Sequence, residues 1–319
     1  MFIPNLQNHD ANDLEAPNDT EVATRLRSIL SGFSIEITTR EASKIDDFRH
    51  YLGAGTEVYI VSTPNTQPEE VVALAKRLRD EDMVPVPHIA ARAIASEDKL
   101  NRWLENLNRQ AEIRAALVIA GGNYDPPLGP YSSSMSMVKN GILERHGIFD
   151  LRFAGHPEGH PIVGSTDLMN ALLEKQEYGE SRQLSVSLVT QFFFDFAPVA
   201  EWAQQLSRSG IRLPIKVGLH GISTLSGLIK QARFCGIGAS IDTLARHPAK
   251  MLRLAAVAAP DSLVLSMVKH SMTAEQTHFS GCHLFSLGNF EKTARWASAI
   301  AGGNFELDGK GTIKLHADL

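Results

Sequence analysis

The stretch EVYIVSTPNTQPEEVVALAKRLRDEDMVPVPH, residues 57–88, contains an apolar run, an amphipathic segment and a second apolar run. The outer runs are rich in Val and Ile, which is typical of strands buried on both faces. In the middle segment, apolar residues recur every three or four positions after Pro68, which predicts a helix with proline in its first turn. The stretch therefore predicts a strand–helix–strand unit.

The same alternation continues along most of the chain. Strands are predicted at Ser34–Thr38, Glu57–Ser62, Val84–His88, Ala115–Ala120, Phe149–Gly155, Ser185–Phe193, Pro214–Leu219 and Cys282–Ser286. Helices are predicted near Glu21–Ser31 and at Pro68–Asp80, Glu97–Asn108, Asp167–Tyr178, Pro198–Ser209, Thr224–Phe234 and Phe290–Ala301, with more within 243–277.

Eight strands that alternate with helices predict an α/β fold, a single-domain (β/α)8 TIM barrel over residues 23–302. A polar arm (1–22) and a polar tail (303–319) flank it. A doubly wound open sheet is the alternative, but no G-x-G-x-x-G pattern opens a helix after the first strand. Gly236-Ile237-Gly238 is only a fragment of that pattern.

The composition narrows the function classes. The 319 residues are 43% hydrophobic and carry a formal net charge of −5, so no strong attraction to nucleic acid or to acidic membranes is expected. Two cysteines without a C-x-x-C spacing argue against a disulfide scaffold or a zinc ribbon. No apolar run reaches the length of a membrane helix, and the first residues do not resemble a signal peptide. We therefore expect a cytoplasmic protein.

In such barrels the active site lies at the carboxyl ends of the strands, so polar residues there are candidates. Glu36 is a carboxylate on the opposite face from Ile35 and Ile37 in an apolar strand. Burial would raise its pKa and make it a general acid near neutral pH. A structural ion pair is the alternative. His88 ends the third strand and is as often structural as functional.

Three further segments carry candidate chemistry. His156-Pro-Glu-Gly-His160 has metal-ligand residue types, but its proline and glycine favour an irregular ligand-holding loop over a metal site. Gln191, in the run TQFFFD (190–195), can pair with the edge of a heterocycle. Gly121-Gly122 lets backbone approach a ligand closely, although a simple turn needs the same residues.

Together these segments resemble methylenetetrahydrofolate reductases over roughly Phe33 to Ala301. FAGHPEGHP (153–161) is similar to the family's A-x-Y-P-E-x-H-P loop, and VTQFFFD (189–195) to its I-T-Q-x-F-F-D strand. Weaker similarities lie at Ile35-Glu36, at Pro87-His88-Ile89 and at 217–222.

The resemblance implies that 5,10-methylenetetrahydrofolate is reduced to 5-methyltetrahydrofolate, with NADH or NADPH as electron source and FAD as hydride relay. It makes Glu36 the proton donor to N10 of the folate. It assigns substrate binding to Gln191, Asn123 and Leu225. Cofactor binding is assigned to Ser62, His88, Gly121, Gly122, Asn123, His156, His160, Asp167, Asn170 and Lys175. It also implies a homodimer or homotetramer, and no metal.

The departures from the family pattern concentrate where FAD is held. Asn123 replaces an aspartate, and Leu173 and Glu174 stand where the family has cationic residues. We therefore expect FAD to be held weakly. Two other hypotheses remain. One is a non-catalytic barrel that binds folate or flavin, and the other is a metal-dependent hydrolase that uses His88, His156, His160 and His220.

Overall fold

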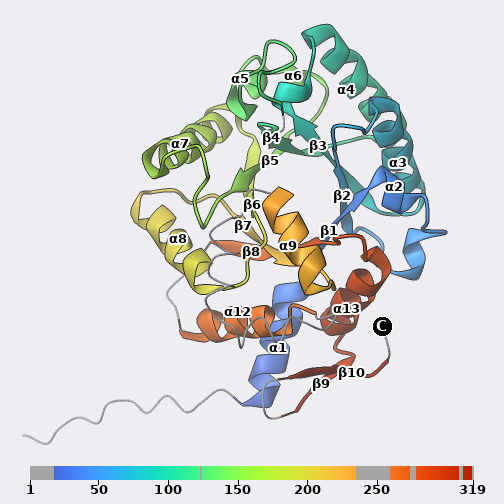
Figure 1. Ribbon diagram of the computed structural model, residues 1–319, viewed down its shortest axis with the longest axis vertical. Coiled ribbons are helices and arrows are strands. Elements are labelled where there is room, and N and C mark those ends of the chain that lie inside the picture. The colour runs from blue at the N-terminus through green and yellow to red at the C-terminus, as the bar shows by residue number, and fades with distance from the viewer. Residues whose placement is uncertain (1–17, 123, 235–258, 274–277, 309–311, 318–319) are drawn as a thin grey trace, which may run out of the picture.

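The computed structural model describes residues 18–122, 124–234, 259–273, 278–308 and 312–317. Eight parallel strands follow one another in chain order, and β8 pairs with β1 to close a barrel (Figure 1). The strands are β1 (Ser34–Thr38), β2 (Glu57–Val61), β3 (Val84–Ala90), β4 (Ala115–Ile119), β5 (Asp150–Gly155), β6 (Ser185–Thr190), β7 (Ile215–His220) and β8 (Phe279–Phe285). The predicted (β/α)8 barrel is confirmed.

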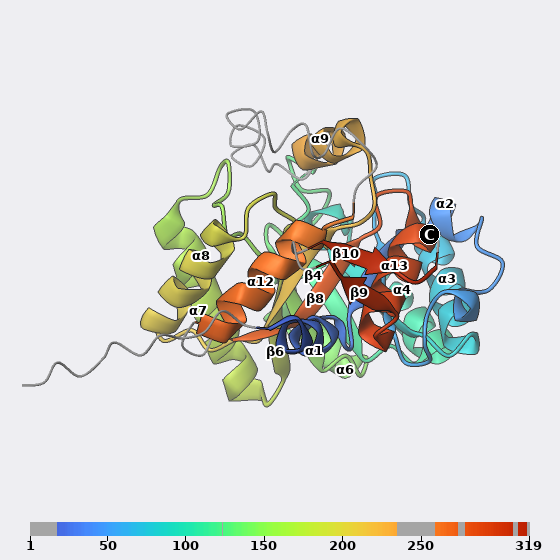
Figure 2. The same ribbon diagram turned by 90° about the horizontal axis from the view of Figure 1, so that it is seen from below.

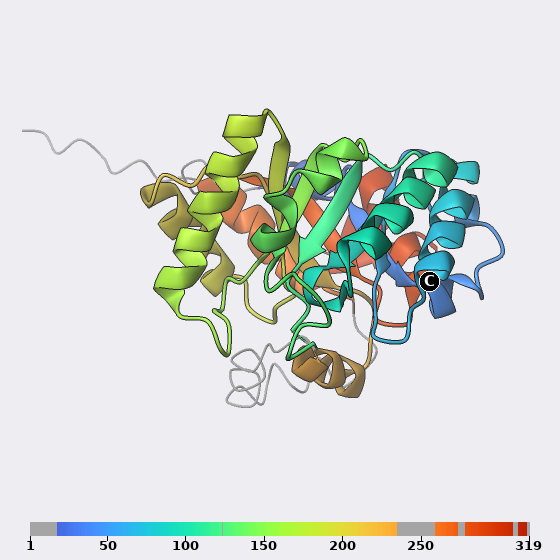
Figure 3. The same cartoon turned by 90° about the horizontal axis from the view of Figure 1, so that it is seen from above.

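Most of the helices surround the barrel wall. The described helices are α1 (Asp19–Leu30), α2 (Thr39–Ala42), α3 (Pro68–Asp80), α4 (Glu97–Ala111), α5 (Ser134–Val138), α6 (Ile142–Arg145), α7 (Ser165–Arg182), α8 (Ala197–Arg208), α9 (Leu225–Phe234), α12 (Asp261–Thr273) and α13 (Phe290–Gly302), with 3-10 turns at Phe48–His50 and Ala91–Ala93. Figures 2 and 3 show α9 set apart from this ring, beyond one end of the barrel. Since α9 closely follows β7, that is the carboxyl end of the strands.

Local sequence explains why these helices begin where they do. The Ser96 side chain accepts a hydrogen bond from the Lys99 backbone N–H at 3.3 Å, which caps α4. Asn18 and Glu21 form a reciprocal capping box at the start of α1. Leu26 and Leu30 of α1 are fully buried, and α1 lies against α12 and α13 (Figure 2).

Seven strands differ from their predicted bounds by one to three residues, and β6 and β8 show the largest differences. β6 ends at Thr190, before the predicted Phe193, because the next three phenylalanines are buried in an irregular segment instead of extending the ladder. Phe192 contacts Phe194 and Phe285, with ring centroids 5.9 and 5.4 Å away. β8 begins at Phe279, before the predicted Cys282, because pairing with β7 extends it through Phe279-Ser280-Gly281, where Phe279 is the single apolar residue.

The expected polar tail (303–319) contains regular structure, and α1 begins at Asp19, within the expected polar arm (1–22). β9 (Phe305–Leu307) and β10 (Ile313–Leu315) form an antiparallel hairpin, and Phe305 and Ile313 are buried in the main core. Residues 1–17 lie outside the described part of the chain. Within 243–277, α12 is one of the expected helices. Residues 243–258 and 274–277 lie outside the described part of the chain.

Side-chain alternation divides the apolar residues between two regions. Ile35 and Ile37 of β1 belong to the large core between barrel and helices. A smaller cluster of Tyr59, Val86, Ala115, Leu117 and Val189 fills the interior of the barrel. Residues on the opposite face from Ile35 and Ile37, Ser34 and Glu36 among them, therefore point into the barrel.

Candidate active site

An ion-pair network, centred on Arg152 of β5, lies inside the barrel near the amino ends of the strands. The Arg152 guanidinium donates to both Glu57 carboxylate oxygens, at 2.7 and 2.6 Å, and to Asp150 at 2.7 Å. Burial alone would raise the pKa of Glu57, but Arg152 and Lys216 outweigh it and lower that pKa to about 2. Arg152 also donates to the Tyr59 hydroxyl, so this network fixes the Tyr59 ring in the barrel interior.

Glu36 lies nearer the carboxyl ends of the strands and is only 8% exposed. Burial, and then the charge of Glu41, raise the pKa of the Glu36 carboxyl to about 8. A carboxyl group with that pKa is protonated at neutral pH and can donate its proton to a substrate. Glu36 thus lies on the opposite face of β1 from Ile35 and Ile37, as the sequence predicts.

His283 of β8 is the neighbour of Glu36 that sequence reasoning missed. Its Nε2 lies 3.7 Å from Glu36 Oε2, and its Nδ1 lies 2.9 Å from Ser34 Oγ. Its ring centroid is 4.4 Å from that of Tyr59. A polar residue inside the predicted strand 282–286 was a possible signal, but only barrel closure shows that it meets β1.

His88 and Gln191 each hold a buried polar atom without a partner among the described residues. His88 Nε2 has none, and burial lowers the pKa of that imidazole to about 4. Gln191 Oε1 has none either, although its backbone N–H donates to the Gly155 carbonyl at 3.2 Å. An unsatisfied buried group costs about 1–3 kcal/mol, so a ligand that supplied partners here would recover that cost.

The loop after β5 is held by its own histidine. His160 Nδ1 accepts hydrogen bonds from the backbone N–H groups of Ile162 and Val163, both at 3.2 Å. The His156 and His160 rings stand edge to face, 5.2 Å apart. Burial, followed by the charges of His160 and Lys175, lowers the pKa of His156 to about 4. Burial also lowers the pKa of His160. Both imidazoles are thus neutral hydrogen-bonding groups near pH 7.

The start of α7 presents Asp167 and Asn170 to solvent, but Lys175 turns inward. Its Nζ donates to the Ala171 carbonyl at 3.2 Å and lies 5.4 Å from the centroid of the Phe153 ring. Burial lowers its pKa to about 8. Glu174 pairs with Lys139, so this turn of the helix offers little free positive charge.

Other predicted site residues lie just after the carboxyl ends of β2 and β4. Ser62 follows β2 directly, and Gly121 follows β4 with φ +84°, a conformation that favours glycine. Gly122 has open space beside its Cα. Asn123 lies outside the described residues, and so does the side chain of Leu225, the first residue of α9.

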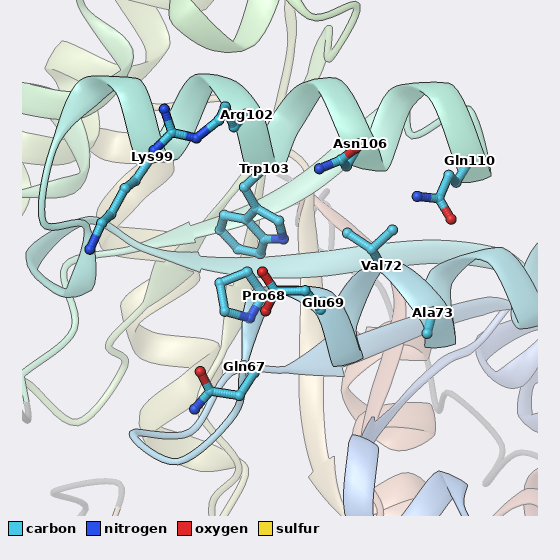
Figure 4. A pocket seen from close by; sticks show the side chains of 10 residues that line it. All are labelled: Gln67, Pro68, Glu69, Val72, Ala73, Lys99, Arg102, Trp103, Asn106 and Gln110. Carbon is cyan, nitrogen blue, oxygen red and sulfur yellow. The ribbon is translucent and has the colours of Figure 1, made fainter.

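Figure 4 shows a hollow of a different kind, a groove of about 550 Å³ between α3 and α4 on the outside of the barrel. Trp103, Lys99 and Arg102 are among its lining residues, and none of the predicted site residues lines it.

In the described parts of the chain, no three His, Cys, Asp or Glu side chains gather as a metal site would need. None of the described helices could cross a membrane.

Two comparisons relate the sequence of this chain to known proteins. The family model described as methylenetetrahydrofolate reductase matches residues 69–289. Methylenetetrahydrofolate reductase 2 of Saccharomyces cerevisiae is 26% identical over 116 residues, which cover 35% of this chain and 18% of the yeast protein. The matched family segment contains His88, Gln191 and His283, while Glu36 precedes it.

Proposed function

Because this chain belongs to the methylenetetrahydrofolate reductase family, we propose that it interconverts 5,10-methylenetetrahydrofolate and 5-methyltetrahydrofolate with NADH or NADPH as hydride source. The observation that carries this proposal is the Glu36 carboxyl, buried in the barrel with a pKa of about 8. Such an acid holds its proton at neutral pH until a substrate with a basic nitrogen lies beside it.

Glu36 would donate that proton to N10 of the folate. Loss of the N10–methylene bond then opens the five-membered ring and leaves an iminium ion at N5. Hydride addition at the methylene carbon completes the reduction. In the reverse direction Glu36 accepts the N10 proton, and the same site serves both directions.

Gln191 would hold the pterin. A carboxamide can both donate and accept, and its Oε1 is buried without a partner among the described residues, so an N–H donor on the pterin edge would satisfy it. Asn123 and Leu225 are proposed as further substrate contacts. Their side chains lie outside the described part of the chain.

The residues fit the ring end of a flavin better than its phosphate end. His88 Nε2 is a buried atom that lacks a partner among the described residues, and Gly121 and Gly122 allow backbone to approach a ring. At the phosphate end, Lys175 is buried against Phe153 and Glu174 is acidic. We therefore propose that FAD is used but held weakly. When bound, FAD would relay hydride from the nicotinamide to the folate.

Ser62, His156, His160, Asp167 and Asn170 are proposed as the remaining FAD contacts. Neutral imidazoles at 156 and 160 can hydrogen-bond without adding charge near the flavin. A homodimer or homotetramer in the cytoplasm remains part of the proposal. A monomeric mass by light scattering at micromolar concentration would contradict the oligomer.

The alternatives receive less support from the geometry. The hydrolase hypothesis needs histidines gathered around a metal, whereas His160 Nδ1 is occupied by its own loop and His220 Nδ1 by the Gly221 carbonyl. A non-catalytic binding barrel does not require an acid with the raised pKa of Glu36.

The test combines a spectrum with an assay. The purified protein is incubated with FAD, its visible spectrum is recorded, and NADH oxidation is followed with 5,10-methylenetetrahydrofolate. We expect turnover that depends on the folate and increases with added FAD. Binding of folate or flavin without turnover in either direction would instead identify a non-catalytic barrel.

A further inference from the structure

Ser34, His283 and Glu36 form a continuous row of polar side chains inside the barrel. Ser34 and Glu36 lie two residues apart on β1 and so share a face, while Ser34 is the direct register partner of His283 on β8. All three are buried, and His283 is only 1% exposed. Their spacing is therefore set by the ladder that closes the barrel and not by a flexible loop.

The Ser34 hydroxyl has two acceptors within reach but only one proton. Its Oγ lies 2.9 Å from His283 Nδ1 and 3.5 Å from the Cys282 carbonyl oxygen. If Ser34 donates to the carbonyl, its oxygen can accept from a protonated Nδ1. If Ser34 donates to Nδ1, that nitrogen must be unprotonated, and the ring proton of a neutral imidazole then lies on Nε2.

These two arrangements match the two states of Glu36. With the proton on Nδ1, Nε2 presents a lone pair that can accept from the protonated Glu36 carboxyl. With the proton on Nε2, the ring can donate to the Glu36 carboxylate. The Nε2–Oε2 separation of 3.7 Å is longer than a hydrogen bond, so this hydrogen bond requires the two side chains to move closer.

We propose that Ser34 and His283 form a tautomer-switching pair that positions Glu36 both as an acid and as a base. The inference rests on the proposed function, in which Glu36 loses and regains one proton in each turnover. The imidazole carries one N–H and Ser34 one O–H in both states. The single proton gained or lost by the row is therefore the one that Glu36 exchanges with N10.

The surroundings keep the ring neutral and fixed. Burial lowers the pKa of His283 well below its usual value, and the nearby positive groups lower it further. The titratable and charged groups that face the row are Glu41 from α2, Tyr59 from β2, His88 from β3, Arg152 from β5 and Lys216 from β7. Because Tyr59 and Phe285 both contact the ring, a tautomer change is easier than a ring flip.

Nitrogen-15 NMR of the histidine side chains tests the pair directly, over a pH range that brackets the Glu36 pKa of about 8. His283→Gln identifies the resonances of His283, and His146→Gln, on the outside of the barrel, is the control. We expect the proton to move from Nδ1 to Nε2 as pH rises, with the ring neutral throughout. Protonation of the same nitrogen at every pH, or of both, would overturn the proposal.

A second measurement uses Ser34→Ala and Ser34→Thr, with the Glu36 titration followed by carbon-13 NMR of labelled glutamate. Alanine removes the hydroxyl that serves Nδ1 in both arrangements, as acceptor in one and as donor in the other. A buried N–H without an acceptor is rarer in proteins than an acceptor without a donor, so the loss disfavours mainly the Nδ1–H tautomer that accepts from protonated Glu36. We expect the Glu36 pKa to fall by about one unit, and threonine to restore it. An unchanged pKa in the alanine variant, or equal shifts in both variants, would contradict the hydroxyl's role. Neither titration requires turnover, so they separate this inference from the proposed function.

Discussion

The negative charge of Glu41 is the second cause, after burial, of the raised pKa of Glu36. Glu41 is itself fixed in place, because its carboxylate accepts hydrogen bonds from the Phe290 backbone N–H at 2.9 Å and from the Ser286 hydroxyl at 3.0 Å. The contact that ties α2 to the start of α13 thus also places a negative charge near the proposed acid.

Replacing Glu41 with glutamine should lower the pKa of Glu36. The amide oxygen can still accept from Phe290, but the charge that opposes ionisation of Glu36 is gone. Because the reaction requires protonated Glu36, folate-dependent turnover should fall off at lower pH in Glu41→Gln than in the unaltered protein. Ser286→Ala, which removes one hydrogen bond and leaves the charge, is the control. A pH profile of Glu41→Gln identical to that of the unaltered protein would contradict the coupling.

Replacing Glu36 with glutamine should abolish proton donation but not binding. General acid catalysis is worth about 10²–10⁴-fold, so we expect turnover to fall by at least about 10² while folate affinity changes little. Glu201→Gln, on the exposed side of α8, is the matched control. Stopped-flow turnover and equilibrium folate binding are measured together. Near-normal turnover would remove Glu36 from the mechanism.

The same substitution should make the protein more stable at neutral pH. The folded pKa of Glu36 is raised from 4.5 to about 8, so the folded state retains a proton that the unfolded chain releases above pH 4.5. Stability is therefore lost as pH rises from 4.5 towards 8, by about 3 kcal/mol at pH 7. Glu36→Gln removes this loss. Its gain in unfolding free energy, measured by denaturant titration, should be larger at pH 8 than at pH 4.5; an equal gain at both would refute the assigned pKa.

Local sequence was sufficient to predict the barrel and the strand face on which Glu36 lies, but not the surroundings of Glu36. A carboxylate among Ile residues in a short apolar run is visible in the sequence, and strand alternation assigns it to the opposite face from those residues. The Ser34–His283 contact joins residues 249 positions apart, and it exists only because β8 closes onto β1. The Arg152–Glu57 pair likewise spans 95 positions and depends on the barrel geometry.

Replacing Gln191 with leucine should weaken folate binding and slow the folate half-reaction. Leucine leaves the pterin edge without its partner, which costs about 1–3 kcal/mol, or roughly 5- to 150-fold in affinity. Gln205→Leu, exposed on α8, is the control for surface change. The half-reactions with NADH and with folate are measured separately. A defect confined to the NADH half-reaction would show that Gln191 does not contact the folate.

Flavin affinity should be low and should improve when positive charge is restored. A charge-assisted hydrogen bond to phosphate is worth roughly 1.5–3 kcal/mol, so losing two would weaken FAD binding by a factor of about 10² or more. The Glu174 carboxylate is engaged by Lys139, and Lys175 is turned against Phe153. We expect a protein that purifies partly colourless and gains activity with added FAD, and a Glu174→Arg variant that binds FAD more tightly.

Fluorescence titration of FAD into the unaltered protein and into Glu174→Arg measures this difference, with Glu177→Arg on an exposed position of α7 as the control. The control adds the same charge to the same helix, so a gain limited to position 174 would place the phosphates near that turn. A protein that keeps its flavin through extensive dialysis would contradict weak binding. A colourless protein that is equally active without added flavin would contradict FAD use, because hydride would then pass directly from the nicotinamide to the folate.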